Sequence, residues 1–130
     1  MTTAPHGPLV LIVDDNEWNL RLARDVLSAA GMETLEATSA DAAIALAAER
    51  LPDVILLDLG LPDMDGADAA RRLRDEARTA RIRLVALSAQ PLEEYGDRLL
   101  EAGFDGVLEK PIDVAEFPDQ VRRYCTERRV

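Results

Sequence analysis

The stretch that decides the fold is VILLDLGLPDMDG, residues 54–66. Four aliphatic residues, 54–57, run without interruption into an acid, Asp58, and the chain then reaches Pro62 and Gly66 within a few residues. A continuous apolar run bounded by turn residues is typical of a strand covered on both faces, as the strands of a parallel sheet are. This segment raises the question of why a buried strand should end on a carboxylate.

Similar aliphatic segments recur on both sides of this stretch. The runs LVLIV (9–13) and LVAL (84–87) are also continuous, whereas METLEA (32–37) and GVLE (106–109) are less apolar and are typical of edge strands. Candidate helices lie between these segments, at about 17–30, 40–50, 66–78, 91–102 and 113–128. The order predicts an α/β fold of the (βα)5 type, with a doubly wound parallel five-stranded sheet.

Two candidate helices carry a clear amphipathic pattern. The first has apolar residues at i, i+3, i+7 and i+10, and the last repeats that spacing: Leu20, Ala23, Leu27 and Ala30, then Val114, Phe117, Val121 and Tyr124. Gly31 supplies a stop for the first helix. In the last helix, Pro118 removes an intrahelical hydrogen bond, so we expect a distorted first turn after a capping-box-like start at Asp113 and Glu116.

The length and the charge limit the possible functions. A chain of 130 residues has room for one domain, and we expect an N-terminal tail over residues 1–8, a folded domain over residues 9–130 and no output domain. The net charge of −10 argues against a nucleic-acid partner, which needs basic residues to neutralise phosphates. The opening MTTAPHGP does not resemble a secretory signal and no apolar run is long enough to span a bilayer, so we expect a cytoplasmic protein with no membrane partner. The single Cys125 excludes a thiolate-cluster metal site.

Polar residues follow the predicted strands at the points where they end. Parallel strands deliver their carboxyl ends to the same edge of the sheet, where open α/β sheets bind ligands. The residues at those ends are Asp14 and Asp15, Asp58, Ser88, and Lys110. We therefore expect three carboxylates, a hydroxyl and an ammonium to converge there.

Such a cluster needs a cation. Two carboxylates about 4 Å apart repel each other by roughly 4 kcal/mol at an effective dielectric constant near 20. An oxygen-only ligand set without His or Cys favours a hard divalent ion, and Mg²⁺ before Ca²⁺ or Mn²⁺. Because Mg²⁺ commonly completes its shell with phosphate oxygens, the constellation predicts a phosphoryl site.

Each of these residues also has a purely structural interpretation. Asp14 and Asp15 could cap the following helix, Asp58 could begin a turn, Ser88 could cap a helix and Lys110 could be an ordinary surface lysine. None of these interpretations explains why the residues occur together at four strand ends. The combination therefore carries the functional hypothesis.

The segments LIVDDN, VILLDLGLPDMDG, LVALSA and VLEKPI resemble the four signature segments of response regulator receiver domains, in the same order and spacing. The resemblance covers about residues 9–128 and implies a flavodoxin-like sheet with the strand order 2-1-3-4-5. It also implies Mg²⁺ as cofactor, a histidine kinase or histidine phosphotransfer protein as phosphoryl donor, and a downstream protein target.

The resemblance assigns roles to individual residues. It implies that Asp58 is the phosphoacceptor, that Asp15 binds Mg²⁺ directly and Asp14 through water, and that Gly60 contributes its backbone carbonyl. Lys110 would pair with a phosphoryl oxygen, and Ser88 with the backbone amide of Ala89 would receive another. The Lys110–Pro111 bond would be cis.

The chain departs from the family pattern at one switch position and leaves two surface features open. Val107 stands where most receivers carry Tyr or Phe, so the aromatic partner of the Ser88 switch is absent. We expect Trp18 to be partly buried over the core; the alternative is an exposed docking contact for the phosphoryl donor. Six arginines around residues 71–83 are expected to form a solvated face: Arg71, Arg72, Arg74, Arg78, Arg81 and Arg83.

Two other functions remain open from the sequence. One is a haloacid-dehalogenase-like phosphatase, which also uses an aspartyl nucleophile with Mg²⁺; its general acid two residues after the nucleophile is missing, because that residue is Gly60. The other is a phosphorylation-independent adaptor on the same fold, which Val107 suggests.

Overall fold

The computed structural model describes residues 7–89 and 92–126. The strands are β1 (Leu9–Val13), β2 (Glu33–Ala37), β3 (Val54–Asp58), β4 (Arg83–Ser88) and β5 (Gly106–Glu109). The helices are α1 (Glu17–Ala29), α2 (Ala40–Arg50), α3 (Gly66–Asp75), α4 (Leu92–Ala102) and α5 (Phe117–Thr126). Most of the expected tail, residues 1–6, and the end of the expected last helix, residues 127–130, lie outside the described residues.

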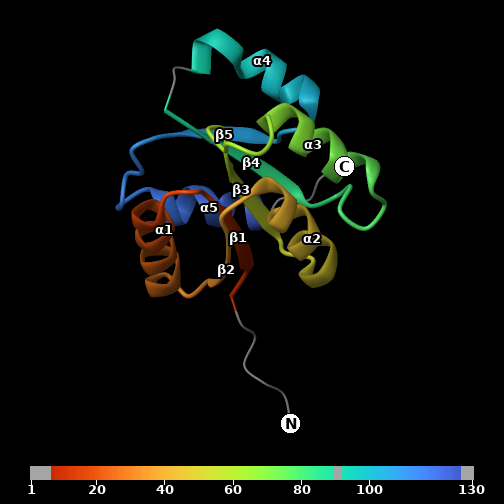
Figure 1. The fold of residues 1–130 in the computed structure, drawn as a ribbon. Coiled ribbons are helices and arrows are strands. Elements are labelled where there is room, and N and C mark those ends of the chain that lie inside the picture. Colours follow the sequence, from red (N-terminus) through yellow and green to blue (C-terminus); the bar gives the residue numbers. More distant parts are fainter. Residues whose placement is uncertain (1–6, 90–91, 127–130) are drawn as a thin grey trace.

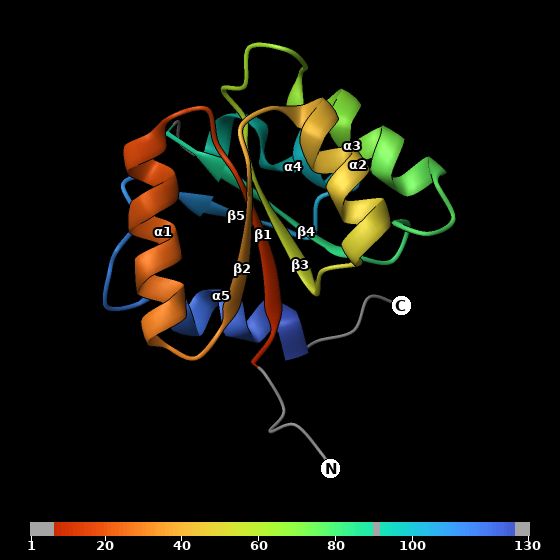
Figure 2. The same ribbon diagram turned by 60° about the horizontal axis from the view of Figure 1, so that its bottom comes forward.

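All four strand pairings are parallel, and the strands lie in the order β2-β1-β3-β4-β5. This confirms the predicted α/β fold, including the weaker strands β2 and β5 at the two edges. Helices α1 and α5 cover one face of the sheet and α2, α3 and α4 the other (Figures 1 and 2). The central strand β3, with β1 and β4 beside it, is therefore covered on both sides.

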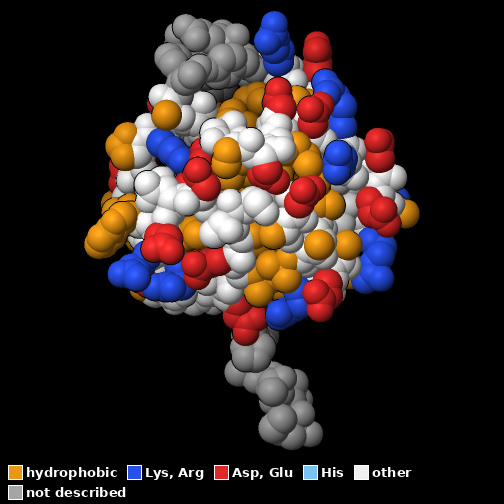
Figure 3. Space-filling model, in the orientation of Figure 1, with side chains coloured by type: hydrophobic (Ala, Val, Ile, Leu, Met, Phe, Trp, Pro, Cys, Tyr) orange, Lys and Arg blue, Asp and Glu red, His pale blue; other side chains and the backbone are white. Residues whose placement is uncertain are grey.

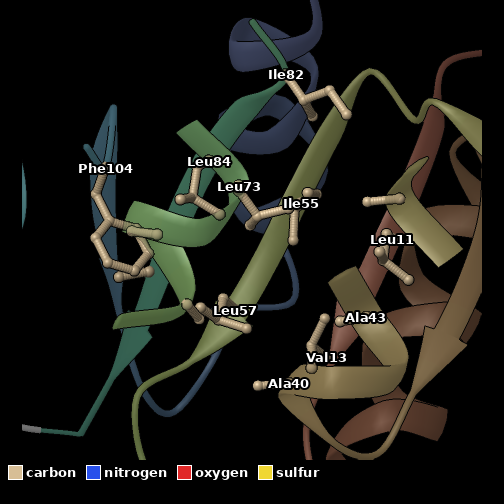
Figure 4. Close-up of a cluster of buried hydrophobic side chains, with 14 of the residues drawn as sticks. Leu11, Val13, Ala40, Ala43, Ile55, Leu57, Leu73, Ile82, Leu84 and Phe104 are labelled. Carbon is tan, nitrogen blue, oxygen red and sulfur yellow. The ribbon is translucent and has the colours of Figure 1, made fainter. Parts of the chain in front are cut away.

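The sheet separates two hydrophobic clusters. Leu11, Ile55 and Leu84 point toward α2, α3 and α4, where small alanines such as Ala43 allow close packing (Figure 4). On the opposite face the alternate strand residues pack against Leu27 of α1 and the apolar residues of α5. All five residues of β3 are buried, including Asp58, of which 8% is exposed. A rigid, fully covered strand thus ends on a carboxylate.

Side-chain caps set the starts of the helices. Asn16, rather than Asp14 or Asp15, caps α1 by accepting hydrogen bonds from the N–H groups of Trp18 and Asn19. The stop predicted at Gly31 is confirmed, since Gly31 follows the C-cap residue Ala30 and adopts a φ of 90°. Helix α3 ends at Asp75, earlier than predicted, because the buried Thr79 hydroxyl donates to the Leu73 carbonyl (2.6 Å) and a turn replaces the last helical residues.

The start of α5 corrects one prediction and supports another. Val114 is not part of the apolar face of α5; it lies in the preceding turn and is 55% exposed. Asp113 accepts the N–H groups of Ala115 and Glu116, which closes that turn before the helix begins at Phe117. Pro118 is then the second helical residue, where its missing N–H would have had no intrahelical partner. The distorted start was expected, but the helix begins later than predicted.

The arginine-rich segment is not a uniformly solvated face. Arg74 is largely buried, with 14% of its side chain exposed, and it donates to the carbonyls of Gly103, Ala80 and Ile82 and to the Asp105 carboxylate. The exposed arginines of α3 form local pairs, Arg71 with Asp68 at 2.9 Å and Arg72 with Asp41 at 3.8 Å. Acidic and basic side chains are interspersed on the face shown in Figure 3. In the described part of the chain, no helix is long and apolar enough to cross a membrane.

Candidate functional site

Three carboxylates meet at the carboxyl edge of the sheet. Asp58 is the last residue of β3, and Asp14 and Asp15 follow the neighbouring strand β1, so the pairing of these strands brings the acids together. Each offers a carboxylate oxygen, and these oxygens all lie within 4.8 Å of one another. Asp14 and Asp58 are buried, whereas Asp15 is exposed. The predicted convergence of acids therefore occurs.

Lys110 joins this cluster from the far side of β4. Its Nζ lies 3.0 Å from Asp14 Oδ2 and 3.0 Å from Asp58 Oδ1, and only 19% of its side chain is exposed. Burial lowers the pKa of Lys110, but hydrogen bonds and attraction from Asp58 and Asp14 outweigh burial and leave the pKa above its usual value of 10.5. The ammonium is therefore charged at neutral pH. The Lys110–Pro111 bond is cis, as the resemblance implies.

The carboxylates differ in how much of their bonding capacity is already used. Asp14 Oδ1 accepts the N–H of Asn16 at 2.9 Å while Oδ2 receives Lys110. Asp58 Oδ1 accepts the N–H of Gly60 at 3.3 Å and also contacts Lys110. Within the described residues, no hydrogen bond or ion pair involves the Asp15 carboxylate. Asp15 is thus the acid best placed to bind an incoming cation directly.

A cavity of about 420 Å³ opens beside Asp58. The end of β4 forms one wall with Ser88, which is 5% exposed, and Ala89, and Gly60 forms part of another wall. Arg98 of α4 also lines the cavity. The expected site residues Ser88, Ala89 and Gly60 thus share one cavity with Asp58. Val107 lies one strand further out, half-buried against the core on the α4 side of the sheet.

Trp18 corrects an expectation. The indole is 75% exposed and does not cover the core. Leu20, Ala23 and Leu27 define the buried face of α1, and Trp18 lies about 200° around the helix from Leu20 at about 100° per residue. The Arg21 guanidinium lies 5.6 Å from the centre of the indole ring.

One residue near the site was missed from the sequence. Asp63 accepts the N–H of Ala40 at 3.0 Å through Oδ1 and that of Asp41 at 3.1 Å through Oδ2. These two bonds lower the pKa of the Asp63 carboxyl below its usual value. In the sequence, Asp63 resembles only a turn residue within PDMDG, because its partners lie more than twenty positions away.

The cluster has the chemistry of a divalent-cation site. Three carboxylates and one ammonium leave a formal net charge of −2 in a small, partly buried volume. All the candidate ligand atoms are oxygens, and the single cysteine, Cys125, lies in α5. Hard cations such as Mg²⁺ prefer this donor set.

Comparisons with known proteins agree on one family. The sequence matches the family model of the response regulator receiver domain over residues 10–122. The polar-differentiation response regulator DivK of Brucella ovis is 35% identical over 115 residues, which is 88% of this chain and 94% of that protein. A putative response regulator from Chloroflexus aurantiacus has a similar structure, with a TM-score of 0.86 and 29% identity over 93% of this chain and 99% of that one. The receiver domain of a sensor histidine kinase from Pseudomonas aeruginosa, solved with a magnesium ion coordinated in its active site cleft, gives a TM-score of 0.84 and 29% identity over the same shares of the two chains.

Proposed function

The chain belongs to the response regulator receiver domain family, and from this membership we propose that Asp58 accepts a phosphoryl group from a phosphohistidine in a Mg²⁺-dependent reaction. One observation carries the proposal: carboxylate oxygens of Asp14, Asp15 and Asp58 lie within 4.8 Å of one another, with the Lys110 ammonium against two of them. The three carboxylates and the Gly60 carbonyl would hold the ion. Bound there, Mg²⁺ supplies positive charge that the transferred phosphoryl group needs.

The protein's own groups carry out the transfer. A carboxylate oxygen of Asp58 attacks the phosphorus atom, the phosphorus–nitrogen bond of the phosphohistidine breaks, and the imidazole leaves with the electron pair. Because β3 is buried along its whole length, Asp58 is held rigidly for in-line attack. Lys110 pairs with one oxygen of the phosphoryl group, and the Ser88 hydroxyl with the Ala89 amide receives another.

Phosphorylation changes the partners of Lys110, and this change is the first step of signalling. The ammonium is shared between Asp14 and Asp58 before transfer. An added phosphoryl group brings about −1.5 to −2 charge and draws both Lys110 and Ser88 toward it. Strand β4, which ends at Ser88, and strand β5, which Lys110 follows, then bias the population of α4 positions that a downstream protein binds. Val107 has no ring to turn inward, so Ser88 carries this movement.

An apolar surface beside the site suits the phosphoryl donor. Trp18 and Leu22 are 75% and 42% exposed on α1. A cavity of about 270 Å³ between Leu22 and Ile112 reaches Lys110 and Asp14. An amphipathic helix presenting phosphohistidine would cover these side chains while its imidazole faces Asp58, with Trp18 as the aromatic anchor.

Labelling with a small phosphoramidate tests the function, since this donor carries the same phosphorus–nitrogen bond. We expect at most one phosphoryl group per chain in the presence of Mg²⁺, no labelling of Asp58→Asn, and little labelling without Mg²⁺. Many turnovers on a phosphomonoester would instead identify a phosphatase. Absence of labelling, in protein shown to be folded, would contradict the proposal.

A phosphorylation-independent adaptor is the second candidate, and Val107 is the observation that favours it. The test compares a binding partner's affinity for the wild type, for Asp58→Asn and for the wild type with beryllofluoride, an acyl-phosphate mimic. Equal affinity in all three would establish the adaptor and remove phosphorylation from the mechanism of signalling.

A further inference from the structure

The side chain of Asp63 joins two connections that the sequence keeps far apart. Asp63 lies in the β3–α3 connection, three residues after Gly60, and its two carboxylate oxygens accept the N–H groups of Ala40 and Asp41 in the first turn of α2. These N–H groups have no intrahelical acceptor, and the start of a helix favours a negative charge. Figure 2 shows the β3–α3 connection passing beside the start of α2. Within the described ranges, no other hydrogen bond joins this connection to α2.

The end of β2, just before α2, also holds the other loop of the site, which is the β1–α1 loop that carries Asp14 and Asp15. The backbone N–H of Asp14 donates to the carbonyl of Ala37, the last residue of β2, at 3.1 Å. The Ser39 hydroxyl accepts the N–H of Ala42 and caps α2. Residues 37–41, which we call the β2–α2 turn, therefore contact both loops that carry the carboxylates and carbonyl of the site.

Other contacts hold the β3–α3 connection on either side of Asp63. Upstream, the N–H of Leu59 donates to Leu87 at 3.1 Å, and Leu61 is buried in the core. Downstream, Asp65 caps α3 by accepting the N–H of Ala67 at 2.9 Å. Gly60 itself is exposed and has no side chain to pack, and its N–H donates to Asp58 Oδ1 at 3.3 Å. The position of its carbonyl therefore depends on how the segment around it is held.

We infer that Asp63 is a positioning residue for the magnesium site: its carboxylate fixes the β3–α3 connection, and with it the Gly60 carbonyl, to the β2–α2 turn that also holds Asp14. The inference rests on the proposed function, because it assigns Gly60 to the metal. Coupling between sites is reciprocal, so bound Mg²⁺ stabilises the Asp63 bonds by the amount that these bonds strengthen Mg²⁺ binding. Mg²⁺ should thus slow hydrogen exchange at the Ala40 and Asp41 amides.

Charge alone could produce a similar effect, and the chain offers variants that separate the two causes. Asp63→Ala removes the charge and both acceptors, whereas Asp63→Asn removes the charge and keeps one oxygen acceptor. Glu17→Gln removes a carboxylate from the first turn of α1 at the same rim without affecting the Asp63 bonds. Asp53→Ala removes a carboxylate that accepts a backbone N–H, that of Leu9, from the opposite edge of the sheet.

The experiment titrates Mg²⁺ into the full chain and each variant while following the fluorescence of Trp18, and measures amide exchange with and without Mg²⁺. We expect Asp63→Ala to weaken Mg²⁺ binding about tenfold, as loss of an outer-shell partner typically does, and Asp63→Asn about threefold. Asp53→Ala should match the wild type, and Mg²⁺ protection at residues 40 and 41 should disappear in Asp63→Ala. Urea unfolding of each variant checks that it is folded. If Asp63→Ala does not fold, the Mg²⁺ affinity of Asp63→Asn tests the inference in its place.

Two results would overturn the inference. One is wild-type Mg²⁺ affinity in Asp63→Ala; the other is an equal loss in Asp63→Ala, Asp63→Asn and Glu17→Gln, which would identify a pure charge effect. A wild-type protein that is labelled by phosphoramidate while its Asp63 variants bind Mg²⁺ normally would disprove only the role of Asp63. A wild type that neither binds Mg²⁺ nor accepts a phosphoryl group would disprove the proposed function itself.

Discussion

Neutralising Asp15 should make the metal-free protein more stable while removing its metal site. The carboxylate oxygens of Asp15, Asp14 and Asp58 lie within 4.8 Å of one another. Lys110 pairs with Asp14 and Asp58 and cancels about one of their two charges, so Asp15 experiences a net repulsion close to that of a single carboxylate. Asp15→Asn removes this repulsion and retains the size of the side chain.

The size of the effect follows from the distance and the exposure. A pair of charges separated by 4.8 Å repels by about 0.9 kcal/mol in water and about 3.5 kcal/mol at an effective dielectric constant of 20. Because Asp15 is exposed, the water value applies. Attraction between Asp15 and the start of α1 offsets a few tenths of a kcal/mol. Asp15→Asn should therefore raise the free energy of unfolding by about 0.5 kcal/mol without metal.

Mg²⁺ should reverse the order of stability. At a concentration about a hundred times its dissociation constant, the ion adds about 2.7 kcal/mol to the stability of a protein that binds it only when folded. The wild type should gain this amount and Asp15→Asn should gain almost none. Urea unfolding of both proteins, with and without Mg²⁺, measures all four values. Glu49→Gln is the control, since Glu49 is an exposed acid near the end of α2, which leads to the start of β3 at the opposite edge of the sheet. An Asp15→Asn protein that is less stable than the wild type without metal, or that gains equally from Mg²⁺, would refute this reasoning.

Four other substitutions or reactions have defined outcomes. Lys110→Met should lower the free energy of unfolding by about 2 kcal/mol, because it leaves two carboxylates uncompensated. Since the pKa of Lys110 is raised, this difference in stability should persist up to pH 10.5, the usual pKa of lysine, and shrink as the pH rises further. Urea unfolding across the alkaline range measures it. Asp63→Asn should be less stable than the wild type at neutral pH, and because the pKa of Asp63 is lowered, the difference should shrink as the pH falls below its usual value of 3.8 in acid titrations of unfolding. Cys125 should react slowly with iodoacetamide until urea unfolds the protein, because burial raises its pKa to about 12; equal rates in the folded and unfolded protein would contradict this. Arg74→Met should cost about 3 kcal/mol in urea unfolding, since it leaves the buried Asp105 carboxylate and three carbonyls without the guanidinium; a loss below about 1 kcal/mol would show that Arg74 is dispensable.

The sheet and the acidic cluster could be predicted because both follow from local patterns and one topological rule. Each strand is a short aliphatic run, and single helices between strands require parallel strands whose carboxyl ends share an edge. That rule places Asp58 beside Asp14 and Asp15 even though it follows them by more than forty positions in the sequence. The side chain of Lys110 reaches the same cluster because it follows the edge strand β5.

Features that depend on distant backbone groups could not be predicted. Asp63 and Arg74 are charged residues in polar segments, and their partners are N–H and carbonyl groups of α2 and of the connections that flank β4 and β5. The exposure of Trp18 differs from the prediction because composition favours burial of tryptophan, whereas the rotation of α1 is set by Leu20, Ala23 and Leu27. The late start of α5 depends on the turn that the Asp113 side chain closes. Apolar periodicity does not reveal this turn and therefore assigns Val114 to the helix.

Calorimetric titration with Mg²⁺ followed by beryllofluoride tests the central claim most directly, namely that the acids at the ends of β1 and β3 form a cation site that receives a phosphoryl group on Asp58. We expect saturable uptake of one Mg²⁺ per chain, then uptake of one beryllofluoride that requires Mg²⁺ and is abolished in Asp58→Asn. Folded wild-type protein that takes up neither ligand would contradict the claim.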